Sequence, residues 1–379
     1  MTNSTEPLYM QIYNQLREDI NARKYHANQR LPTEKELCQM YHVSRITSKK
    51  ALNMLVDDNL IVRIKGKGSY ISHSQSQKDT TQDIYNNKQV AIGVIMSEFD
   101  NAYGQDMLAS IEENCRINNA ICIFYRPKND QHAEEKAIDD LVEFGVDGII
   151  ILPVHGVYYN AKILRLILDG FPVVVVDRDL RGIPTHFVGT DNVIAAEQAI
   201  DHLIQAGHTK IGIYSHESKK TSTLEDRMEG VQRSLQKNNI MLDSSYFFTQ
   251  SFCQFPISKN QEAFVKDRAS IMQHIQANKD MTAAFGVEYH LTTIIKSAIE
   301  GLGMKVPDDI SIICFDSPKM EIPSSYTLTH MRQNQEEIGK RAFDLLLSLI
   351  HGQVLENNLK ISLAAELVHG NSIKKISTS

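Results

Sequence analysis

The sequence predicts an α/β protein in which a small, mainly helical domain precedes a larger body of two doubly wound parallel-sheet lobes. Three observations predict this organisation. A polar segment at residues 73–88 divides the chain, short apolar runs alternate with amphipathic stretches behind it, and helix caps followed by a glycine turn stand ahead of it. The 379 residues are enough for two or three domains.

The dividing segment, HSQSQKDTTQDIYNNK at residues 73–88, contains almost no aliphatic side chains. Such a composition buries too little apolar surface to fold on its own, so we expect a flexible linker there. The predicted domains are therefore residues 1–72, the head, and residues 89–379, the body.

The head and the body differ in charge. Residues 1–72 hold 11 Lys and Arg against 7 Asp and Glu, whereas the rest of the chain holds 29 against 39. A basic head on an acidic body is the distribution expected when only the head contacts nucleic-acid phosphates. For so small an excess, a basic face that is merely solvated is the alternative.

The first helix is predicted over residues 8–20, where apolar side chains recur every fourth position at Leu8, Ile12, Leu16 and Ile20. A second helix is expected to begin after Thr33, because Glu36 three residues later completes a capping box. Ser44 is expected to cap a third helix that runs to about Asp58. Two helices joined by a short turn form a helix-turn-helix.

Residues 62–71, VRIKGKGSYI, alternate around a glycine turn that carries two lysines, as the hairpin of a winged helix does. Arg45 and Lys49, four positions apart, would share one face of the third helix and enter the major groove of duplex DNA together. Ser44 and Thr47 would lie at the helix N-terminus, where hydroxyls and free backbone N–H groups suit a phosphate. A solvated hairpin with incidental lysines is the alternative for the wing.

Four segments of the head resemble the GntR family of winged helix-turn-helix domains: Pro7-Leu8-Tyr9, residues 31–37 (LPTEKEL), Val43-Ser44-Arg45 and residues 66–71 (GKGSYI). By position, the resemblance implies DNA contacts at Lys35, Ser44, Arg45, Thr47, Lys49, Lys65, Gly66, Lys67 and Gly68. Lys35 and Lys49 stand where arginine is commoner in the family. We therefore expect Arg45 to read bases and the lysines to hold phosphates.

The body repeats a strand–helix pattern twice. Runs rich in Val and Ile predict buried strands at Val90–Met96, Ala120–Tyr125, Gly148–Leu152, Pro172–Asp177, Lys210–Ser215, Met281–Val287 and Ile310–Asp316. Apolar spacing predicts helices at Tyr103–Asn118, His132–Phe144 and Tyr158–Asp169, and another through Val193, Ala196, Ile200 and Leu203. Two such series favour two doubly wound lobes.

Six segments of the body resemble LacI/GalR regulators and periplasmic sugar-binding proteins: residues 92–95 (IGVI), 146–150 (VDGII), 172–178 (PVVVVDR), 189–192 (GTDN), 202–208 (HLIQAGH) and 306–312 (VPDDISI). The resemblance implies a two-lobed periplasmic-binding-protein-like domain. It places lobe 1 at about residues 89–190 and 318–350, and lobe 2 at about residues 191–317 and 351–379.

The same resemblance implies a sugar site at the strand ends that face the cleft between the lobes. Planar polar side chains would pair with vicinal hydroxyls, and an aromatic face would cover the apolar side of a sugar ring. The implied effector contacts are Asp100, Asn101, Tyr103, Arg178, Asp191, Arg227, Glu288, Tyr289, Asp316 and Gln333. For each of them, capping a helix or bridging the lobes is the structural alternative. The family usually has Asn-Asp where this chain has Glu288-Tyr289, which changes the hydrogen-bond set.

A GntR-type head on a LacI-type body resembles the arrangement of the arabinose repressors of Gram-positive bacteria. The resemblance implies a repressor of carbohydrate-utilisation genes that binds a double-stranded DNA operator as a homodimer. A sugar such as L-arabinose would release it. A regulator that senses another sugar or a nucleoside, including one that uses it as a corepressor, is the alternative.

Other function classes lack their motifs. The chain has no GxGxxG after its first strand in the body, no P-loop and no GxSxG elbow, so neither an enzyme nor a cofactor is predicted. The five cysteines are scattered without a CxxC pair, and no metal site is predicted. No apolar run approaches the roughly 20 residues of a membrane span, and the N-terminus has no apolar signal core. A cytoplasmic location without membrane contact is therefore expected.

Overall fold

The computed structural model describes residues 8–21, 24–25, 29–58, 60–64, 68–71, 89–154, 160–216, 221–241, 243–251, 261–319, 326–353 and 359–376. The chain divides into two compact units, Met1–Lys88, which contains the head and the predicted linker, and Gln89–Ser379, the body. The predicted linker, residues 73–88, lies outside the described residues.

The head is a helix-turn-helix with a two-stranded hairpin. Its elements are α1 (Leu8–Asn21), α2 (Glu34–Tyr41), α3 (Arg45–Asp57), β1 (Ile61–Ile64) and β2 (Gly68–Ile71), and the two strands pair antiparallel. The apolar stripe of α1 packs against α3, and the buried core is Ile12, Tyr13, Leu16, Ile20, Leu31, Leu37, Ala51, Leu52, Leu55, Ile61 and Ile71. The three predicted helices and the predicted hairpin are confirmed.

Both predicted helix caps of the head are present. The Thr33 hydroxyl accepts a hydrogen bond from the Glu36 backbone N–H at 3.3 Å, and the Glu36 carboxylate accepts one from the Thr33 N–H at 2.7 Å. The Ser44 hydroxyl accepts from the Thr47 N–H at 3.3 Å and so begins α3. Between the helices, His42 has a φ of 50°, which ends α2 and turns the chain.

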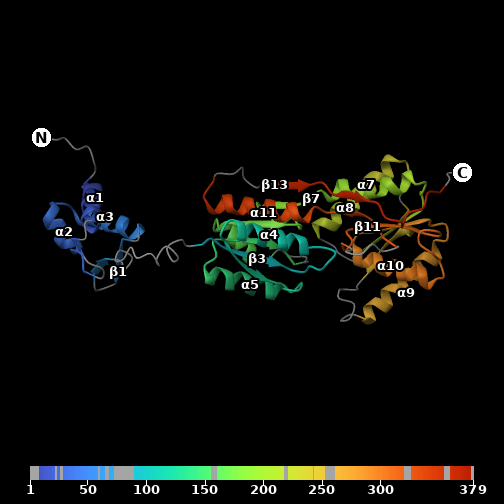
Figure 1. The fold of residues 1–379 in the computed structure, drawn as a ribbon, viewed down its shortest axis with the longest axis horizontal. Coiled ribbons are helices and arrows are strands. Elements are labelled where there is room, and N and C mark those ends of the chain that lie inside the picture. The colour runs from blue at the N-terminus through green and yellow to red at the C-terminus, as the bar shows by residue number, and fades with distance from the viewer. Residues whose placement is uncertain are drawn as a thin grey trace. The chain divides into compact units, whose positions relative to one another are not determined.

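Lobe 1 of the body is built on an entirely parallel sheet. Its strand order is β13 (Lys360–Leu363), β7 (His186–Thr190), β6 (Val173–Val176), β5 (Gly148–Leu152), β3 (Ala91–Met96) and β4 (Ile121–Tyr125). The buried runs of Val and Ile supply apolar side chains to both faces. Figure 1 shows α4 (Gln105–Ile117) and α11 (Gln335–Ile350) beside each other on one face and α5 (Gln131–Phe144) on the other. The short helix α6 (Ala161–Leu168) lies with α5.

Lobe 2 repeats the architecture. Its strand order is β14 (Glu366–Val368), β12 (Thr329–Arg332), β11 (Ser311–Phe315), β10 (Ala283–Gly286), β8 (Ile211–His216) and β9 (Phe247–Ser251), with only β14 antiparallel among these strands. Helix α7 (Asn192–Gln205) packs against α8 (Ser222–Lys237), and α9 (Gln261–Ala277) against α10 (Tyr289–Gly301). A 3₁₀ turn at Ser244–Tyr246 precedes β9. The predicted α/β class with two doubly wound lobes is confirmed.

The chain crosses between the lobes near its C-terminus in a way that differs from the predicted boundaries. Strand β12, predicted in lobe 1, lies in the lobe 2 sheet, and β13, predicted in lobe 2, forms the edge of the lobe 1 sheet. Of the two elements in the segment predicted for lobe 1 at residues 318–350, α11 lies in lobe 1 as expected and β12 does not. An edge strand is placed by its pairing partner, and hydrophobic pattern does not reveal that partner.

The matching strand orders put two aspartates at equivalent positions. Asp177 follows β6 and Asp316 follows β11, and both have left-handed backbone conformations, with φ of 64° and 55°. Each backbone N–H bonds the neighbouring strand, at Val188 and Met331 respectively. Both carboxylates are therefore held at the carboxyl ends of parallel strands, where doubly wound folds bind ligands.

Candidate DNA-binding surface and ligand cleft

The start of α3 presents polar and basic side chains to solvent. Ser44 and Arg45 are exposed, Lys49 is exposed one turn later, and Thr47 is partly buried. Lys35 is exposed on α2. A helix N-terminus with hydroxyls and cations suits a DNA backbone and the edges of its bases.

The predicted wing tip is described only in part. Lys65, Gly66 and Lys67 lie outside the described residues, and Gly68 opens β2 with a φ of 118°. Gly68 also lies against Arg30, since an added Cβ would stand 3.0 Å from the Arg30 Nε. The position therefore needs glycine both for its backbone and for the close approach of Arg30.

Glu34 links α3 to the hairpin. Its Oε2 lies 3.0 Å from the Arg45 Nε, and its Oε1 pairs with the Arg63 guanidinium. Arg63 also donates from Nη1 to the Asn53 Oδ1 at 2.8 Å. The hydrogen bonds from Arg63 and Arg45 lower the pKa of Glu34, so it stays ionised. Arg45 is oriented through its Nε while its side chain remains 83% exposed.

Ser48, on the inner face of α3, fixes that helix to α2. Its hydroxyl is fully buried and lies 3.1 Å from the Arg45 carbonyl oxygen and 3.3 Å from that of Glu34. The Cys38 sulfur is 3.4 Å from the same hydroxyl. A small polar residue here lets the two helices approach closely with its hydroxyl hydrogen-bonded.

In the body, lobe 1 brings Tyr103 onto Asp177. The phenol donates to the Asp177 Oδ1 at 2.6 Å. Burial, then the charges of Asp177 and of Asp316 in lobe 2, raises the pKa of Tyr103 well above its usual value. The hydroxyl thus stays protonated, and carboxylates from both lobes lie around it.

Arg178, next to Asp177, has a buried donor without a partner. Its Nη1 donates to the Ser97 hydroxyl at 3.1 Å and to the Pro153 carbonyl. Its Nε is 3.8 Å from the Asp177 Oδ2, beyond hydrogen-bond distance, and is unsatisfied among the described residues. Burial lowers the pKa of the guanidinium. A buried unsatisfied donor is costly, so this position suits a ligand acceptor.

Arg227 is the corresponding buried cation of lobe 2. Its Nε donates to the Asn192 Oδ1 at 2.8 Å and its Nη1 to the Val287 carbonyl oxygen at 2.7 Å. Its guanidinium carbon lies 3.8 Å from the centroid of the Phe315 ring. The two hydrogen bonds and the cation–π contact with the ring hold the guanidinium in one orientation.

Asp316 and Gln333 form a buried acceptor–donor pair in lobe 2. The Gln333 amide donates to the Asp316 Oδ2 at 2.7 Å, and the Gln333 backbone N–H donates to Oδ1 at 3.3 Å. Burial raises the pKa of Asp316 to about 7, although nearby Arg227 acts in the opposite direction. The side-chain carbonyl oxygen of Gln333 is buried and has no partner among the described residues.

Glu288 caps α10 and binds a histidine. Its Oε1 accepts from the His216 Nε2 at 2.9 Å and from the Leu291 backbone N–H at 2.9 Å. Burial acts to raise the pKa of Glu288, but the hydrogen bond and charge of His216 outweigh it and lower the pKa. The adjacent Tyr289 packs edge-on against His290, with ring centroids 5.3 Å apart.

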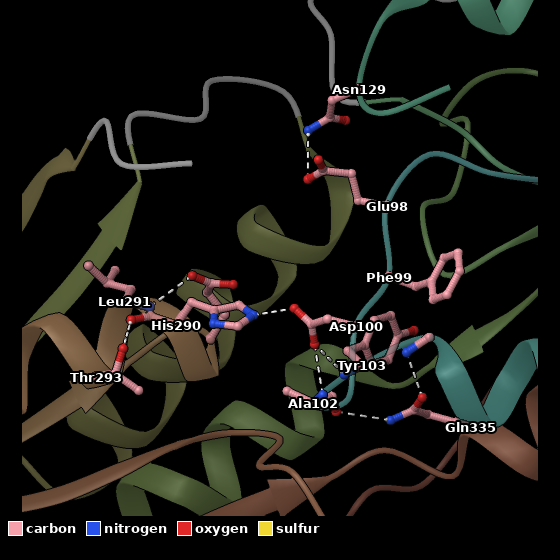
Figure 2. Close-up of polar contacts among 12 residues, drawn as sticks. Glu98, Phe99, Asp100, Ala102, Tyr103, Asn129, His290, Leu291, Thr293 and Gln335 are labelled. Atoms are coloured by element: carbon pink, nitrogen blue, oxygen red, sulfur yellow. Dashed lines mark hydrogen bonds and ion pairs between the residues drawn. The ribbon is translucent and has the colours of Figure 1, made fainter. Parts of the chain in front are cut away.

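Asp100 of lobe 1 forms an ion pair with His290 of lobe 2. Figure 2 shows the His290 imidazole pointing at the Asp100 carboxylate, and the His290 Nε2 pairs with its Oδ2. The other oxygen accepts from the backbone N–H groups of Ala102 at 2.7 Å and Tyr103 at 3.2 Å. The predicted neighbour Asn101 is exposed.

Asp191 caps a helix, which was the structural alternative to contacting the effector. Its side chain accepts from the Ile194 N–H at 3.0 Å and caps α7. The next residue, Asn192, is the one that contacts Arg227. Gln335 plays a matching part after β12, since its side-chain oxygen accepts from the Gly104 N–H at 2.6 Å in lobe 1. After each crossing from a strand of one lobe to a helix of the other, a side chain at the start of that helix bonds a residue of the helix's own lobe.

Three polar residues that contact predicted site residues were not themselves predicted: His216, Asn192 and His290. Ser222 was not predicted either, and its buried hydroxyl has no partner among the described residues. Two of them could have been found from the sequence because they are neighbours of predicted residues: Asn192 follows Asp191, and His290 follows Glu288-Tyr289. Ser222 lies in the first turn of α8, the helix that carries Arg227.

No group of three or more His, Cys, Asp or Glu side chains in the part of the chain that the structure describes could hold a metal ion. None of the helices described is both long and apolar enough to cross a bilayer.

Three family models match the chain. Residues 8–71 match the bacterial regulatory proteins of the gntR family. Residues 89–244 match the periplasmic binding proteins and sugar binding domain of the LacI family. Residues 200–373 match a periplasmic binding protein-like domain. The matches coincide with the head and the body.

Curated relatives match over most of their length. An arabinose metabolism transcriptional repressor of Geobacillus stearothermophilus is 23% identical over 99% of this chain and 100% of that protein. The probable HTH-type transcriptional regulator EndR of Paenibacillus polymyxa is 24% identical over 84% of this chain and 90% of that protein. The repressor PurR of Aliivibrio salmonicida is 24% identical over 75% of this chain and 82% of that protein.

Solved structures share the fold of the body. The transcription regulator CcpA of Lactococcus lactis superposes with a TM-score of 0.65 at 24% identity, over 76% of this chain and 100% of that chain. A LacI family regulator of Enterococcus faecium with bound ribose gives a TM-score of 0.62 at 22% identity, over 76% of this chain and 100% of that chain. The chain thus joins a winged helix domain of the GntR family to a periplasmic-binding-protein-like domain of the LacI type.

Proposed function

We propose that the chain is a DNA-binding transcription repressor of carbohydrate-utilisation genes, released from its operator by a sugar such as L-arabinose. The observation that carries the proposal is the pairing, in one chain, of a GntR-type head with a LacI-type two-lobed body. One relative named arabinose metabolism transcriptional repressor aligns over 99% of this chain and 100% of its own length.

The head would bind the operator through the start of α3 and the wing. Arg45 would read bases, because its guanidinium is exposed and held in place by Glu34. Exposed Lys35 and Lys49 would contact phosphates, with Ser44 and Thr47 at the helix N-terminus. The proposal extends to the wing-tip residues Lys65, Gly66, Lys67 and Gly68.

The cleft would hold a polyhydroxylated ligand. Sugar hydroxyls both donate and accept hydrogen bonds, so they can satisfy the Arg178 Nε and the Gln333 side-chain carbonyl oxygen, which have no partner in the described part of the chain. Arg227 and Asp316 add a fixed donor and a fixed acceptor beside them. Further proposed contacts are Asp100, Asn101, Tyr103, Glu288 and Tyr289, with Asp191 acting through the cap of α7.

Ligand binding would alter DNA affinity by closing the lobes and changing how two heads are held. A ligand shifts such a balance only by its differential affinity for the two states. The proposal therefore requires a homodimer formed through the bodies, on a pseudo-palindromic operator. Edge strand β4 offers a contact, because Ile121 is 43% exposed and nearby Ile117, at the end of α4, is 66% exposed.

The protein would work in the cytoplasm, where its operator is, and it would bind its ligand without transforming it. The described cleft residues form salt bridges, caps and hydrogen bonds to backbone, and their unpartnered atoms suit ligand hydroxyls. A regulator that responds to binding alone needs only such contacts to its ligand.

Two observations favour a second effector class. Glu288 and Tyr289, at the start of α10 beside His290, present a carboxylate and an aromatic ring, which suit a heterocycle as well as a sugar. Relatives named PurR match 75% or more of this chain. A nucleoside or another sugar, acting as inducer or as corepressor, is the alternative effector.

Thermal unfolding of the full chain against a panel of pentoses, hexoses, their phosphates and nucleosides tests the effector. A ligand that binds only the native state raises the unfolding midpoint by an amount set by its concentration over Kd. A rise with L-arabinose and not with D-ribose supports the proposed effector. A rise with a nucleoside alone supports the alternative, and no rise with any sugar contradicts the sugar proposal.

A further inference from the structure

One contact across the cleft joins the two lobes through a histidine, and its use rests on the proposed function. Asp100 follows β3 of lobe 1, and His290 lies in the first turn of α10 of lobe 2. Their carboxylate and imidazole are paired in Figure 2, with side chains 40% and 21% exposed respectively. The pair exists only when the lobes are together.

Each partner is held in place by its own lobe. The Asp100 Oδ1 accepts from the backbone N–H groups of Ala102 and Tyr103, at 2.7 and 3.2 Å, which leaves Oδ2 facing His290. In lobe 2, the Glu288 carboxylate caps the first turn of α10 by accepting from the Leu291 backbone N–H at 2.9 Å, and within that helix the Thr293 hydroxyl donates to the His290 carbonyl oxygen at 2.7 Å. The geometry is therefore built into both strand–helix junctions.

The charges around His290 favour its protonated form. Burial acts to lower the pKa of His290, but the hydrogen bond that His290 donates to Asp100 and the charges of Glu288 and Asp100 raise it more, against a smaller opposing effect of His216. Burial acts to raise the pKa of Asp100, and the hydrogen bond and charge of His290 outweigh it. An imidazolium between Asp100 and Glu288 is the state that the cleft stabilises.

We propose that His290 is a positioning residue for effector binding. By pairing with Asp100, protonated His290 holds the two lobes together, so its protonation sets the affinity of the site between the lobes for a sugar. The pair is kept when the sugar binds. Closing the lobes forms it, so closing takes up a proton, and the closed form is the one that surrounds the ligand.

Other ion pairs between the described parts of the lobes contain no histidine. Arg181 of lobe 1 pairs with Glu225 at 2.8 Å and with Asp226 on α8, and Lys319 pairs with Asp106 at 2.7 Å. Arginine and lysine stay protonated near pH 7. The His290 contact differs from them because histidine changes charge in that range.

The direction of the pH dependence follows from the raised pKa. Below about pH 6.5, the ordinary histidine value, His290 is protonated in open and closed forms alike and the pair is fully present. As the pH rises through the raised pKa of the closed form, the pair weakens and the affinity falls. One proton is involved, so the loss is at most about tenfold per pH unit.

The first arm of the test needs no ligand. Unfolding midpoints of the full chain are compared for the wild type, His290→Gln, Asp100→Asn and the double variant, at about pH 6 and about pH 8.5. We expect the double variant to lose no more than either single variant at the lower pH, and the coupling to disappear at the higher pH. Additive losses at both pH values would overturn the contact.

The second arm measures the affinity for L-arabinose by calorimetry at the same two pH values. We expect the wild type to bind about tenfold more weakly at the higher pH. His290→Gln and Asp100→Asn should show no such difference. His290→Lys should restore tight binding at both pH values, because lysine stays charged.

The outcomes separate the proposal from the function on which it rests. An Asp100→Asn variant that keeps the wild-type pH dependence would overturn the positioning role, since His290 would then act on the sugar directly. Absence of L-arabinose binding in the wild type counts against the proposed effector, while the ligand-free coupling still upholds or overturns the interlobe contact.

Discussion

The Nε of Arg45 lies 3.0 Å from the Oε2 of Glu34, so the side chain proposed to read bases is oriented by an acidic residue of the preceding helix. The same carboxylate pairs with Arg63 of the hairpin. An exposed ion pair contributes little to stability. Its consequence is geometric, because a guanidinium must be aligned to bind two acceptors of one base.

Glu34→Gln is expected to weaken binding to a duplex that the chain selects from a random pool. The loss should approach the roughly 1–3 kcal/mol of a bidentate base contact, because Arg45 loses its charged partner. Fluorescence anisotropy at one fixed salt concentration measures it. Glu18→Gln, which removes the same charge from an exposed position on α1, is the control. Equal affinities of the two variants would contradict the role of Glu34.

Lys49→Ala should weaken DNA binding without regard to sequence, because an exposed lysine at this position would contact phosphate. The slope of log affinity against log salt should fall by about one. Anisotropy titrations over a range of salt on selected and random duplexes give both quantities. Lys305→Ala, an exposed lysine of lobe 2, should leave both unchanged. A loss confined to the selected duplex would instead make Lys49 a base reader.

Arg227→Lys should weaken L-arabinose binding at least about tenfold and leave DNA binding without sugar unchanged. Lysine keeps the charge but cannot bond Asn192 and Val287 together, so stability should also fall by about 1–3 kcal/mol. Calorimetry and denaturant unfolding measure the two effects. Arg233→Lys, exposed on the same helix, is the control. Unchanged sugar affinity in Arg227→Lys would remove Arg227 from the site.

Asp316→Asn should remove a pH dependence of stability. Burial raises the pKa of Asp316 to about 7, so the native state holds this proton more tightly than the unfolded chain does. Stability therefore falls as the pH rises from about 4 to about 7, by at most about 1.4 kcal/mol per pH unit.

The measurement for Asp316 is the difference in unfolding free energy between wild type and variant across that pH range. The variant should gain relative to the wild type as the pH rises. Asp308→Asn, whose side chain is 65% exposed, is the control. A difference that does not vary with pH would contradict the raised pKa.

Ile121→Glu should shift the chain from dimer to monomer, because it places a charge on exposed edge strand β4. Sedimentation velocity measures the change. Phe144→Glu is the matched control, since Phe144 is 68% exposed on α5, which covers the opposite face of the sheet from α4. A dimer that survives Ile121→Glu unchanged would move the proposed contact away from β4.

Elements whose signal is local were predictable from the sequence. Thr33 and Ser44 carry their caps within three residues, and the buried run at Gly148–Leu152 must be covered on both faces, which favours a parallel sheet. The cleft residues Arg178 and Asp316 follow such strands directly, so family position was enough to place them at the strand ends.

Elements defined by distant partners were not predictable. Strand β13 is short and half exposed, and only its pairing with β7 assigns it to lobe 1. His290 lies 190 positions from Asp100, and no periodicity links residues of opposite lobes. The interlobe contact therefore became visible only once the two lobes were placed against each other.

The most direct test of the account is the affinity of the full chain for its selected duplex with and without saturating L-arabinose. The wild type should bind the duplex more weakly with the sugar, and Arg227→Lys should bind it equally at a sugar concentration that releases the wild type. An affinity of the wild type that stays the same under saturating sugar would contradict the coupling of cleft and head.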